Sequence, residues 1–217
     1  MKKHWMNFNI QHKFVSVVYV LIIFLLFIPY DLYAFDLAVR ANDDELDVWE
    51  LSIEENVNYP IIPFQLKPQI RSIIQDQYDK FRAQNYNVKL IRDNEAIMIT
   101  IPISELFIEN TTEVEESFHK IIYILLPYLK IKEMYRIIFA MHHDETLNSS
   151  QADEITHKRV FKLIDEIAEM TPNASYVIPY SMGNSYPITK NSLKNKRLEI
   201  FILPGQTMLE LAIENKL

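Results

Sequence analysis

The chain has 217 residues, a length typical of one domain with a small appendage. Its formal charge of -7 argues against a general nucleic-acid binder, because neutralising phosphates requires a basic surface. Cysteine is absent and glycine occurs only at Gly183 and Gly205, which excludes disulfides, thiolate chemistry, a cysteine-linked lipid and a glycine-rich phosphate loop.

The N-terminal residues 1–34 have the order of an export signal. Three lysines precede an uncharged apolar run over residues 14–30, and the first acidic residue is Asp31. We predict a signal peptide cleaved after Ala34 or, because the run nearly reaches the roughly 20 residues of a membrane-spanning helix, a retained membrane anchor. Either would export the remainder of the chain. A buried helix of a cytosolic protein is the weaker alternative.

Residues 35–67 are acidic and contain prolines without a sustained hydrophobic period, so we interpret them as an extended lead-in. Apolar residues then recur at helical spacing over 68–84, which predicts an amphipathic helix. Two strand-like runs follow at 86–91 and 96–101, and the turn residues Asp93-Asn94 between them predict a hairpin.

A second helix is predicted over 113–129, because an apolar stripe follows Thr112 and Glu115, which together resemble a capping box. The next run, over 135–141, is short and uniformly apolar. This pattern is typical of a strand that is buried on both faces.

The third helix is expected to begin at a cap formed by Ser150 and Asp153 and to end before Pro172. Strands at 175–180 and 198–203 complete the predicted elements. The resulting order, ββαβαββ, predicts an α+β fold in which helices alternate with strands and lie across a mixed sheet.

A candidate site lies where the predicted buried strand ends. Asp144 follows that strand directly, and Arg159 comes 15 residues later on the next helix. The carboxyl end of a strand beside its crossover helix is where open α/β sheets commonly form clefts. A carboxylate accepts bonds from an ammonium and a guanidinium matches a carboxylate, so the pair would suit an amino-acid head group. The alternative is a surface ion pair, worth about 0–1 kcal/mol.

Residues 137–144 resemble the strand and Gly-His-Thr-Asp turn of the OmpA-like peptidoglycan-binding domain, with His142 and Asp144 at the matching positions. Residues 155–160 are similar to the Leu-Ser-x-x-Arg-Ala helix of that family and stand at the family's spacing from Asp144. Further matches are residues 183–187 to a Gly-x-x-x-Pro loop, residues 195–200 to an Asn-Arg-Arg-Val-Glu-Ile strand, and Phe107 with Val114 to the pair that opens the first helix.

The resemblance covers about residues 95–203 and implies a βαβαβ mixed sheet with helices packed on it. It further implies non-covalent binding of the peptidoglycan stem peptide, through diaminopimelate, in the periplasm or cell envelope of a Gram-negative-type bacterium. Asp144 and Arg159 would be the main contacts, Asn110 would flank the pocket, and His142 would belong to the binding turn. The resemblance implies neither a cofactor nor a reaction.

This sequence departs from the family pattern at Met141, Ala152 and Ser192, where the family has Gly, Asn and Arg. The departures would weaken binding or mark a domain that keeps only the fold. In the second case, we expect a structural or assembly subunit of an envelope-spanning secretion or motility complex. The predicted organisation is a leader over 1–34, a lead-in over 35–67, a helix and strand extension over 68–94, the OmpA-like domain over 95–203 and a C-terminal tail over 204–217.

Two other chemistries are disfavoured. A metal site at His142 and His143 is opposed by strand geometry, because adjacent strand residues point to opposite faces. A hydrolase that combines His142 and Asp144 with Ser149 or Ser150 lacks a nucleophile elbow. A small basic group is interpreted as a solvated loop and strand edge; it comprises Lys190, Lys194, Lys196 and Arg197.

Overall fold

The computed structural model describes residues 61–109, 111–131, 133–171, 177–190 and 192–217. The predicted leader, most of the lead-in and Asn110 lie outside these residues, so the expectations for them stay predictions. Among the described helices, none is both long and apolar enough to cross a membrane.

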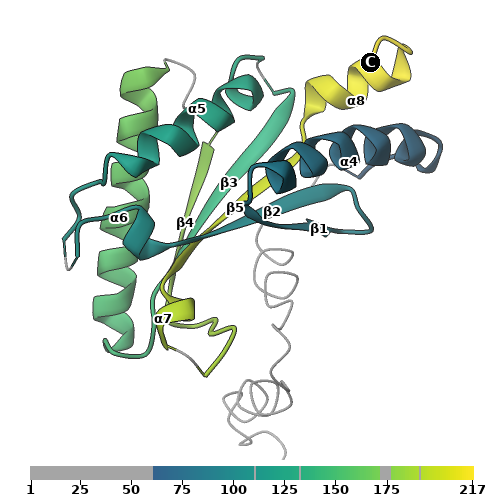
Figure 1. Ribbon diagram of the computed structural model, residues 1–217. Coiled ribbons are helices and arrows are strands. Elements are labelled where there is room, and N and C mark those ends of the chain that lie inside the picture. The colour runs from purple at the N-terminus through teal and green to yellow at the C-terminus, as the bar shows by residue number, and fades with distance from the viewer. Residues whose placement is uncertain (1–60, 110, 132, 172–176, 191) are drawn as a thin grey trace, which may run out of the picture. The chain divides into compact units, whose positions relative to one another are not determined.

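The described strands form one mixed sheet (Figure 1). They are β1 (Asn87–Ile91), β2 (Ala96–Pro102), β3 (Tyr135–His142), β4 (Val177–Gly183) and β5 (Arg197–Pro204). Their spatial order is β1-β2-β5-β3-β4. Strand β5 pairs antiparallel with both β2 and β3, whereas β3 and β4 are parallel. The α+β class and the mixed sheet expected from the sequence are therefore confirmed.

Four helices of the described part accompany the sheet (Figure 1). They are α4 (Lys67–Ala83), α5 (Ser117–Leu129), α6 (Ser149–Met170) and α8 (Gln206–Ile213), and shorter turns lie at η1 (Phe64–Leu66), η2 (Ile103–Glu105) and α7 (Ser192–Asn195). All four helices contribute buried side chains to one large core cluster together with one face of the sheet. We call this face the helix-covered face.

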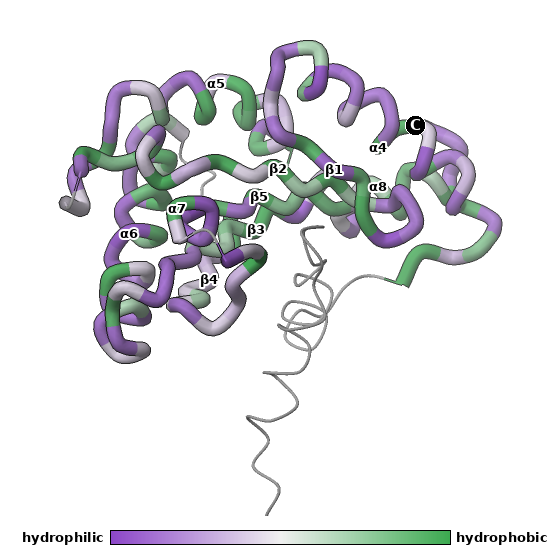
Figure 2. Tube along the Cα trace, turned by 60° about the horizontal axis from the view of Figure 1, so that its bottom comes forward, coloured by the Kyte–Doolittle hydropathy of each residue, from purple (hydrophilic) through white to green (hydrophobic). Residues whose placement is uncertain are grey.

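Strand alternation divides the sheet into two apolar surfaces. In β3, Ile137 and Phe139 belong to the helix-covered cluster, whereas Ile138 and Ala140 belong to a second cluster. Successive side chains of a strand point to opposite faces, so the second cluster marks the other side of the sheet. Figure 2 shows hydrophobic colouring along β2 and β5 and hydrophilic colouring over much of α4.

The predicted hairpin is confirmed, with Ile91 paired to Ala96 across the turn. The turn residues Arg92, Asp93 and Asn94 all have positive φ. Asp and Asn tolerate this left-handed conformation better than most residues, which explains their place in a tight turn.

The capping box predicted at Thr112 and Glu115 is wrong. Helix α5 begins at Ser117, and its first turn has no side-chain cap. The preceding residues instead form a closed loop, in which Phe107 and Val114 pair as an isolated bridge. A short hydrophobic bridge therefore replaces the expected first helical turn.

The predicted cap of α6 is also displaced. The side chain of Asn148 accepts a hydrogen bond from the Gln151 N–H at 3.0 Å, so the helix begins before Ser150. The helix ends at Met170. This end agrees with the stop predicted ahead of Pro172, because a residue before proline disfavours the helical conformation. Helices α7 and α8 were not anticipated from the sequence.

Candidate functional site

The site is built where β3 passes into the loop that leads to α6. The pairing of β3 with β4 shifts register between Met141 and His142. Beyond the shift, the His143 N–H donates to the Gly183 carbonyl at 2.6 Å. This bond holds the residues just after β3 against the end of β4, so Asp144 has a fixed position beyond the strand.

Asp144 is 1% exposed and has partners on both carboxylate oxygens. The backbone N–H and the hydroxyl of Thr146 donate to Oδ1, and His143 Nδ1 lies 2.9 Å from the same atom. Lys196 Nζ lies 3.2 Å from Oδ2. Burial acts to raise the pKa of Asp144, but the contacts with Thr146 and Lys196 outweigh it and hold that pKa below its usual value. Asp144 is therefore ionised at neutral pH.

The two carboxylate oxygens of Asp144 differ in how well they are satisfied. Oδ1 accepts hydrogen bonds, whereas buried Oδ2 has no hydrogen-bond donor among the described residues. The Lys196 ammonium is close to Oδ2 but does not meet hydrogen-bond geometry, so the contact is an ion pair only. Because this ion pair is the contact that Oδ2 makes among the described residues, Oδ2 is the natural acceptor for a ligand N–H.

Arg159, on α6, is 5% exposed and holds the loop before α5. Its Nε and Nη2 donate to the Thr111 carbonyl at 3.1 and 2.9 Å. Its guanidinium carbon lies 5.2 Å from the ring centroid of Phe107, within cation–π range. Burial lowers the pKa of Arg159 from its ordinary value. Arg159 thus reaches the loop in which Asn110 stands, although Asn110 itself is outside the described residues.

Asp144 and Arg159 are not joined by a hydrogen bond or ion pair in the described part of the chain. They are connected through Gly183 and Thr156. Gly183 accepts from the His143 N–H, and its own N–H donates to the Thr156 hydroxyl at 3.3 Å. Arg159 is three residues beyond Thr156, on the adjacent turn of α6. The helix therefore packs against the end of β4 at Thr156, while Arg159, one turn further on, contacts Thr111 and Phe107.

Gly183 is required at this junction for two reasons. Its φ is +53°, which disfavours residues with a Cβ, and a Cβ placed there would lie 2.0 Å from Asp153 Oδ1. The close approach of β4 to α6 depends on this glycine, which explains why the Gly183–Pro187 loop begins with one.

His142 lies in a separate buried network. Its Nε2 is 3.1 Å from Glu199 Oε2, and Arg197 Nε donates to Glu199 Oε1 at 2.7 Å. Arg197 also donates to the carbonyls of Asn195 and Tyr186. We call His142, Arg197 and Glu199 the inner network.

The charge states within the inner network follow from burial and mutual contact. Burial is the main cause that lowers the pKa of His142, so its imidazole is neutral at pH 7. Burial acts to raise the pKa of Glu199, but His142 and Arg197 together lower it to about 2. The inner network is therefore built around a carboxylate and a guanidinium that neutralise each other.

Sequence reasoning missed the partners of Asp144 and of Glu199. Arg197 was expected at a solvated edge, but it is 1% exposed, so that expectation is wrong. The signal was the alternation of Arg197 and Glu199 along an otherwise apolar strand, which places both side chains on one face. Lys196 gave no comparable signal, because its contact with Asp144 joins distant parts of the chain. Among the described residues, no three His, Asp or Glu side chains gather in a way that could hold a metal.

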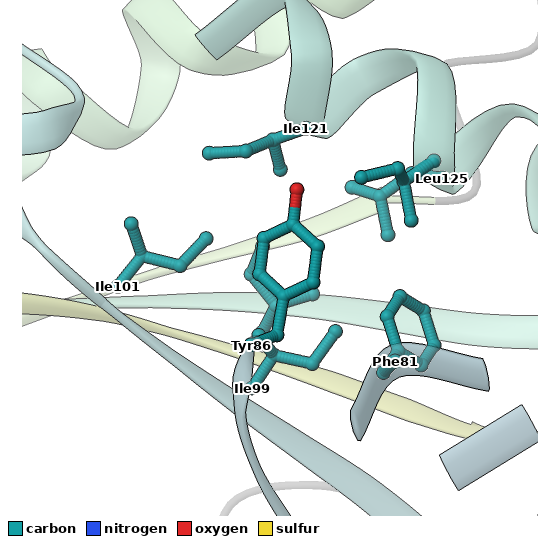
Figure 3. A pocket seen from close by; sticks show the side chains of 8 residues that line it. Phe81, Tyr86, Ile99, Ile101, Ile121 and Leu125 are labelled. Carbon is teal, nitrogen blue, oxygen red and sulfur yellow. The ribbon is translucent and has the colours of Figure 1, made fainter. Parts of the chain in front are cut away.

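A pocket lies between α5 and the sheet, apart from the site residues (Figure 3). Its lining is Phe81, Tyr86, Ile99, Ile101, Ile121, Ile124, Leu125 and Ile200. Tyr86 supplies the only polar side chain in that lining, and none is charged. The pocket therefore offers no groups that would recognise a zwitterion.

Comparison with known proteins defines the fold. No family model matches the chain. No curated protein matches it either. Among solved structures, a putative MotB like protein from Desulfovibrio vulgaris matches with a TM-score of 0.53 and 14% identity, over 64% of this chain and 99% of that one. This likeness confirms the OmpA-like fold expected from the sequence motifs.

Two further solved structures match over similar parts of the chain. The cell wall anchor of the T6SS from Pseudomonas aeruginosa has a TM-score of 0.47 and 19% identity, over 58% of this chain and 92% of that one. The periplasmic domain of Helicobacter pylori MotB has a TM-score of 0.47 and 20% identity, over 59% of this chain and 87% of that one.

Proposed function

We propose that this protein binds peptidoglycan non-covalently in the bacterial cell envelope and catalyses no reaction on it. The OmpA-like fold and the motifs at residues 137–144 and 155–160 support this function. The observation that carries the proposal is Asp144 itself: a buried, ionised carboxylate at the end of a strand, with one oxygen that lacks a hydrogen-bond donor among the described residues.

In the proposed complex, the amino group of a diaminopimelate residue donates to Asp144 Oδ2. The carboxylate of the same head group binds the guanidinium of Arg159, which directs Nε and Nη2 toward the Thr111 carbonyl and has five N–H donors in all. Each such charge-assisted bond contributes about 1.5–3 kcal/mol. A ligand with both charges is therefore favoured over one that carries only an amine or only an acid.

Access to the site requires movement of the groups that cover it. The Lys196 ammonium is paired with Asp144 Oδ2, and the Lys196 side chain is 31% exposed. The ammonium can therefore leave Asp144 and be hydrated by solvent instead. The loop carrying Thr111 covers Arg159 in the same way. Ligand binding then replaces the Lys196 ammonium with the ligand ammonium at one carboxylate oxygen.

Sedimentation with purified sacculi tests this function. The variants Asp144→Ala and Arg159→Ala, shown to be folded by circular dichroism, should lose sedimentation. The matched controls Glu145→Ala and Lys158→Ala remove exposed charges next to the two site residues and should sediment like the parent. The site assignment fails if the folded Asp144 and Arg159 variants sediment as well as the parent does.

A second candidate function is a docking subunit of an envelope-spanning assembly. It is favoured by the internal pairing of the site, since Asp144 is neutralised by Lys196 and Arg159 is bonded to the chain's own backbone. Failure of the parent protein to sediment with sacculi would support this second function. Mass spectrometry of the mature protein can identify its N-terminal residue and so test membrane attachment. A start at Phe35 would exclude a retained membrane anchor.

A further inference from the structure

Among the described residues, Thr146 is the one that places two hydrogen-bond donors on the carboxylate of Asp144. Its backbone N–H donates to Asp144 Oδ1 at 3.2 Å, and its side-chain hydroxyl donates to the same oxygen. Aspartate side chains often bond in this way to the residue two positions further on in a turn. Rotation of the carboxylate would break both bonds. The contacts therefore keep Oδ1 toward Thr146 and leave Oδ2 facing Lys196.

The other two polar neighbours hold this carboxylate less directly. The hydrogen bond of His143 Nδ1 goes to the backbone carbonyl of Asp144 at 3.1 Å, although the same nitrogen lies 2.9 Å from Oδ1. Lys196 pairs with Oδ2, and its ammonium is the group that the ligand replaces in the proposed complex. Among the described residues, the two Thr146 bonds are therefore the hydrogen bonds to the carboxylate that persist during this exchange.

We infer, on the basis of the peptidoglycan-binding function proposed above, that Thr146 is a positioning residue of the site: its two donors keep Asp144 Oδ2 turned toward the incoming ligand ammonium. A hydroxyl has a single proton, and that of Thr146 is donated to Oδ1. Thr146 therefore acts through Asp144. It removes rotational freedom that ligand binding would otherwise have to restrict.

The loop that carries Thr146 is held on both sides, as a positioning residue requires. On one side, the backbone just before Asp144 is bonded to the end of β4. On the other side, Asn184 Nδ2 donates to the Leu147 carbonyl at 3.0 Å, and the side chain of Asn148 caps the first turn of α6. The Thr146 donors are therefore presented from a backbone that β4 and α6 fix in place.

Charge favours the same role. Asp144 is 1% exposed, whereas Thr146 lies exposed at the surface. Burial acts to raise the pKa of Asp144, and the strongest of the contacts that lower this pKa is the hydrogen bond from the Thr146 side chain, ahead of Lys196. An exposed threonine thus helps to keep a buried aspartate ionised, as binding of an ammonium requires. Removing the threonine hydroxyl changes the site without disturbing the core.

Binding of a soluble diaminopimelate-containing muropeptide to the full chain tests the role of Thr146. Thr146→Val keeps the backbone donor and the branched shape but removes the hydroxyl, so we expect about a tenfold loss of affinity at pH 7. Thr146→Ser keeps the hydroxyl and should bind like the parent. Ser150→Ala, which removes an exposed hydroxyl at the start of α6, is the matched control and should also bind like the parent. Circular dichroism checks that each variant is folded.

The titration of Asp144 gives a second measurement that does not depend on the ligand. NMR of the free full chain, labelled at the aspartate carboxyl carbons, should show a higher pKa of Asp144 in Thr146→Val than in the parent, and the parent value in Thr146→Ser. On acidification, Thr146→Val should therefore lose muropeptide affinity at a higher pH than the parent does. His143 and Lys196, the titratable groups that face Asp144 in the described part of the chain, are the same in every variant.

Failure of the proposed function and failure of the role of Thr146 give different results. Absence of muropeptide binding by the parent would refute the proposed function, and the pKa of Asp144 would still test whether Thr146 holds the carboxylate. Parent-like affinity of folded Thr146→Val, or an unchanged pKa of Asp144 in that variant, would overturn the role of Thr146. Failure of Thr146→Ser to restore both properties would also overturn it, because the hydroxyl would then not be the group responsible.

Discussion

Two polar clusters lie at the same end of β3 and differ in how completely they are paired. In the inner network, both oxygens of Glu199 are occupied by His142 and Arg197, deep under the surface. Asp144 is two residues beyond His142 and equally buried, but its Oδ2 has only an ion pair, with a lysine whose side chain is about a third exposed. In the first arrangement the carboxylate is fully paired, and the buried atom that lacks a hydrogen-bond partner among the described residues is His142 Nδ1; in the second, the carboxylate itself keeps an acceptor for an incoming group.

The comparison teaches that burial of charge does not by itself mark a binding site. A buried carboxylate whose two oxygens are both bonded stabilises the fold. Removing its cation destabilises the protein, because the carboxylate is left buried without a compensating charge. A buried carboxylate whose cation can leave is able to exchange that cation for a ligand. The substitutions below separate these two roles, beginning with the largest expected effect.

Removing the cation of the inner network should have the largest effect on stability. Arg197→Met leaves the Glu199 carboxylate buried without its guanidinium, which should lower the free energy of unfolding by about 3–5 kcal/mol. Chemical denaturation of the full chain measures this value. A loss below about 1 kcal/mol would show that the inner network is not the structural cluster described above.

The inner network should also make stability depend on pH. The folded-state pKa of His142 lies below its ordinary value near 6.5, so the unfolded chain takes up a proton first and stability falls as the pH drops below 6.5. Glu199 has a folded-state pKa of about 2 against an ordinary value of 4.5, so its contribution is lost as the pH falls between those values.

The variant His142→Gln separates the two steps of this pH dependence. Glutamine keeps a donor toward Glu199 but does not titrate, so the variant should lose about 1–3 kcal/mol at pH 7 and should lack the decline that begins near pH 6.5. The decline below pH 4.5 should remain but be weaker, because Arg197 alone then lowers the pKa of Glu199. Denaturation curves between pH 7.5 and pH 3 measure both, and an unchanged upper step would contradict the assignment to His142.

A smaller loss of stability than that of Arg197→Met is expected for Lys196→Ala, because the lysine is partly solvated although its partner Asp144 is buried. The same change frees Asp144 Oδ2 for a ligand ammonium, so sedimentation with sacculi should become stronger. Lys194→Ala, two residues away, is the control. Weaker sedimentation of the Lys196 variant would mean that the lysine itself contacts the ligand.

The succession of strands along the chain could be predicted because each strand carries its own local signal. The turn residues Asp93-Asn94 predicted the hairpin, and the apolar run before His142 predicted β3. Helix starts were less accurate. The pairing of Phe107 with Val114 is a tertiary effect that overrides the local capping pattern at Thr112.

The partners of the site residues could not be predicted in the same way. Motif spacing located Asp144 and Arg159, but the Lys196 ion pair and the Thr111 carbonyl join segments that are 52 and 48 residues apart in the chain. Such contacts depend on the three-dimensional register of β5 and of the loop before α5. Local periodicity carries no information about that register, so the contacts of Lys196 with Asp144 and of Glu199 with His142 were found only in the structure.

The most direct measurement is the affinity of the full chain for a soluble diaminopimelate-containing muropeptide, compared between the parent and Asp144→Asn. Asparagine keeps an acceptor for Thr146 but removes the charge. We therefore predict at least a tenfold loss of affinity, about 1.4 kcal/mol, with a change in unfolding free energy well below that of Arg197→Met. Equal affinity of the parent and the Asp144→Asn variant would contradict the proposed role of Asp144.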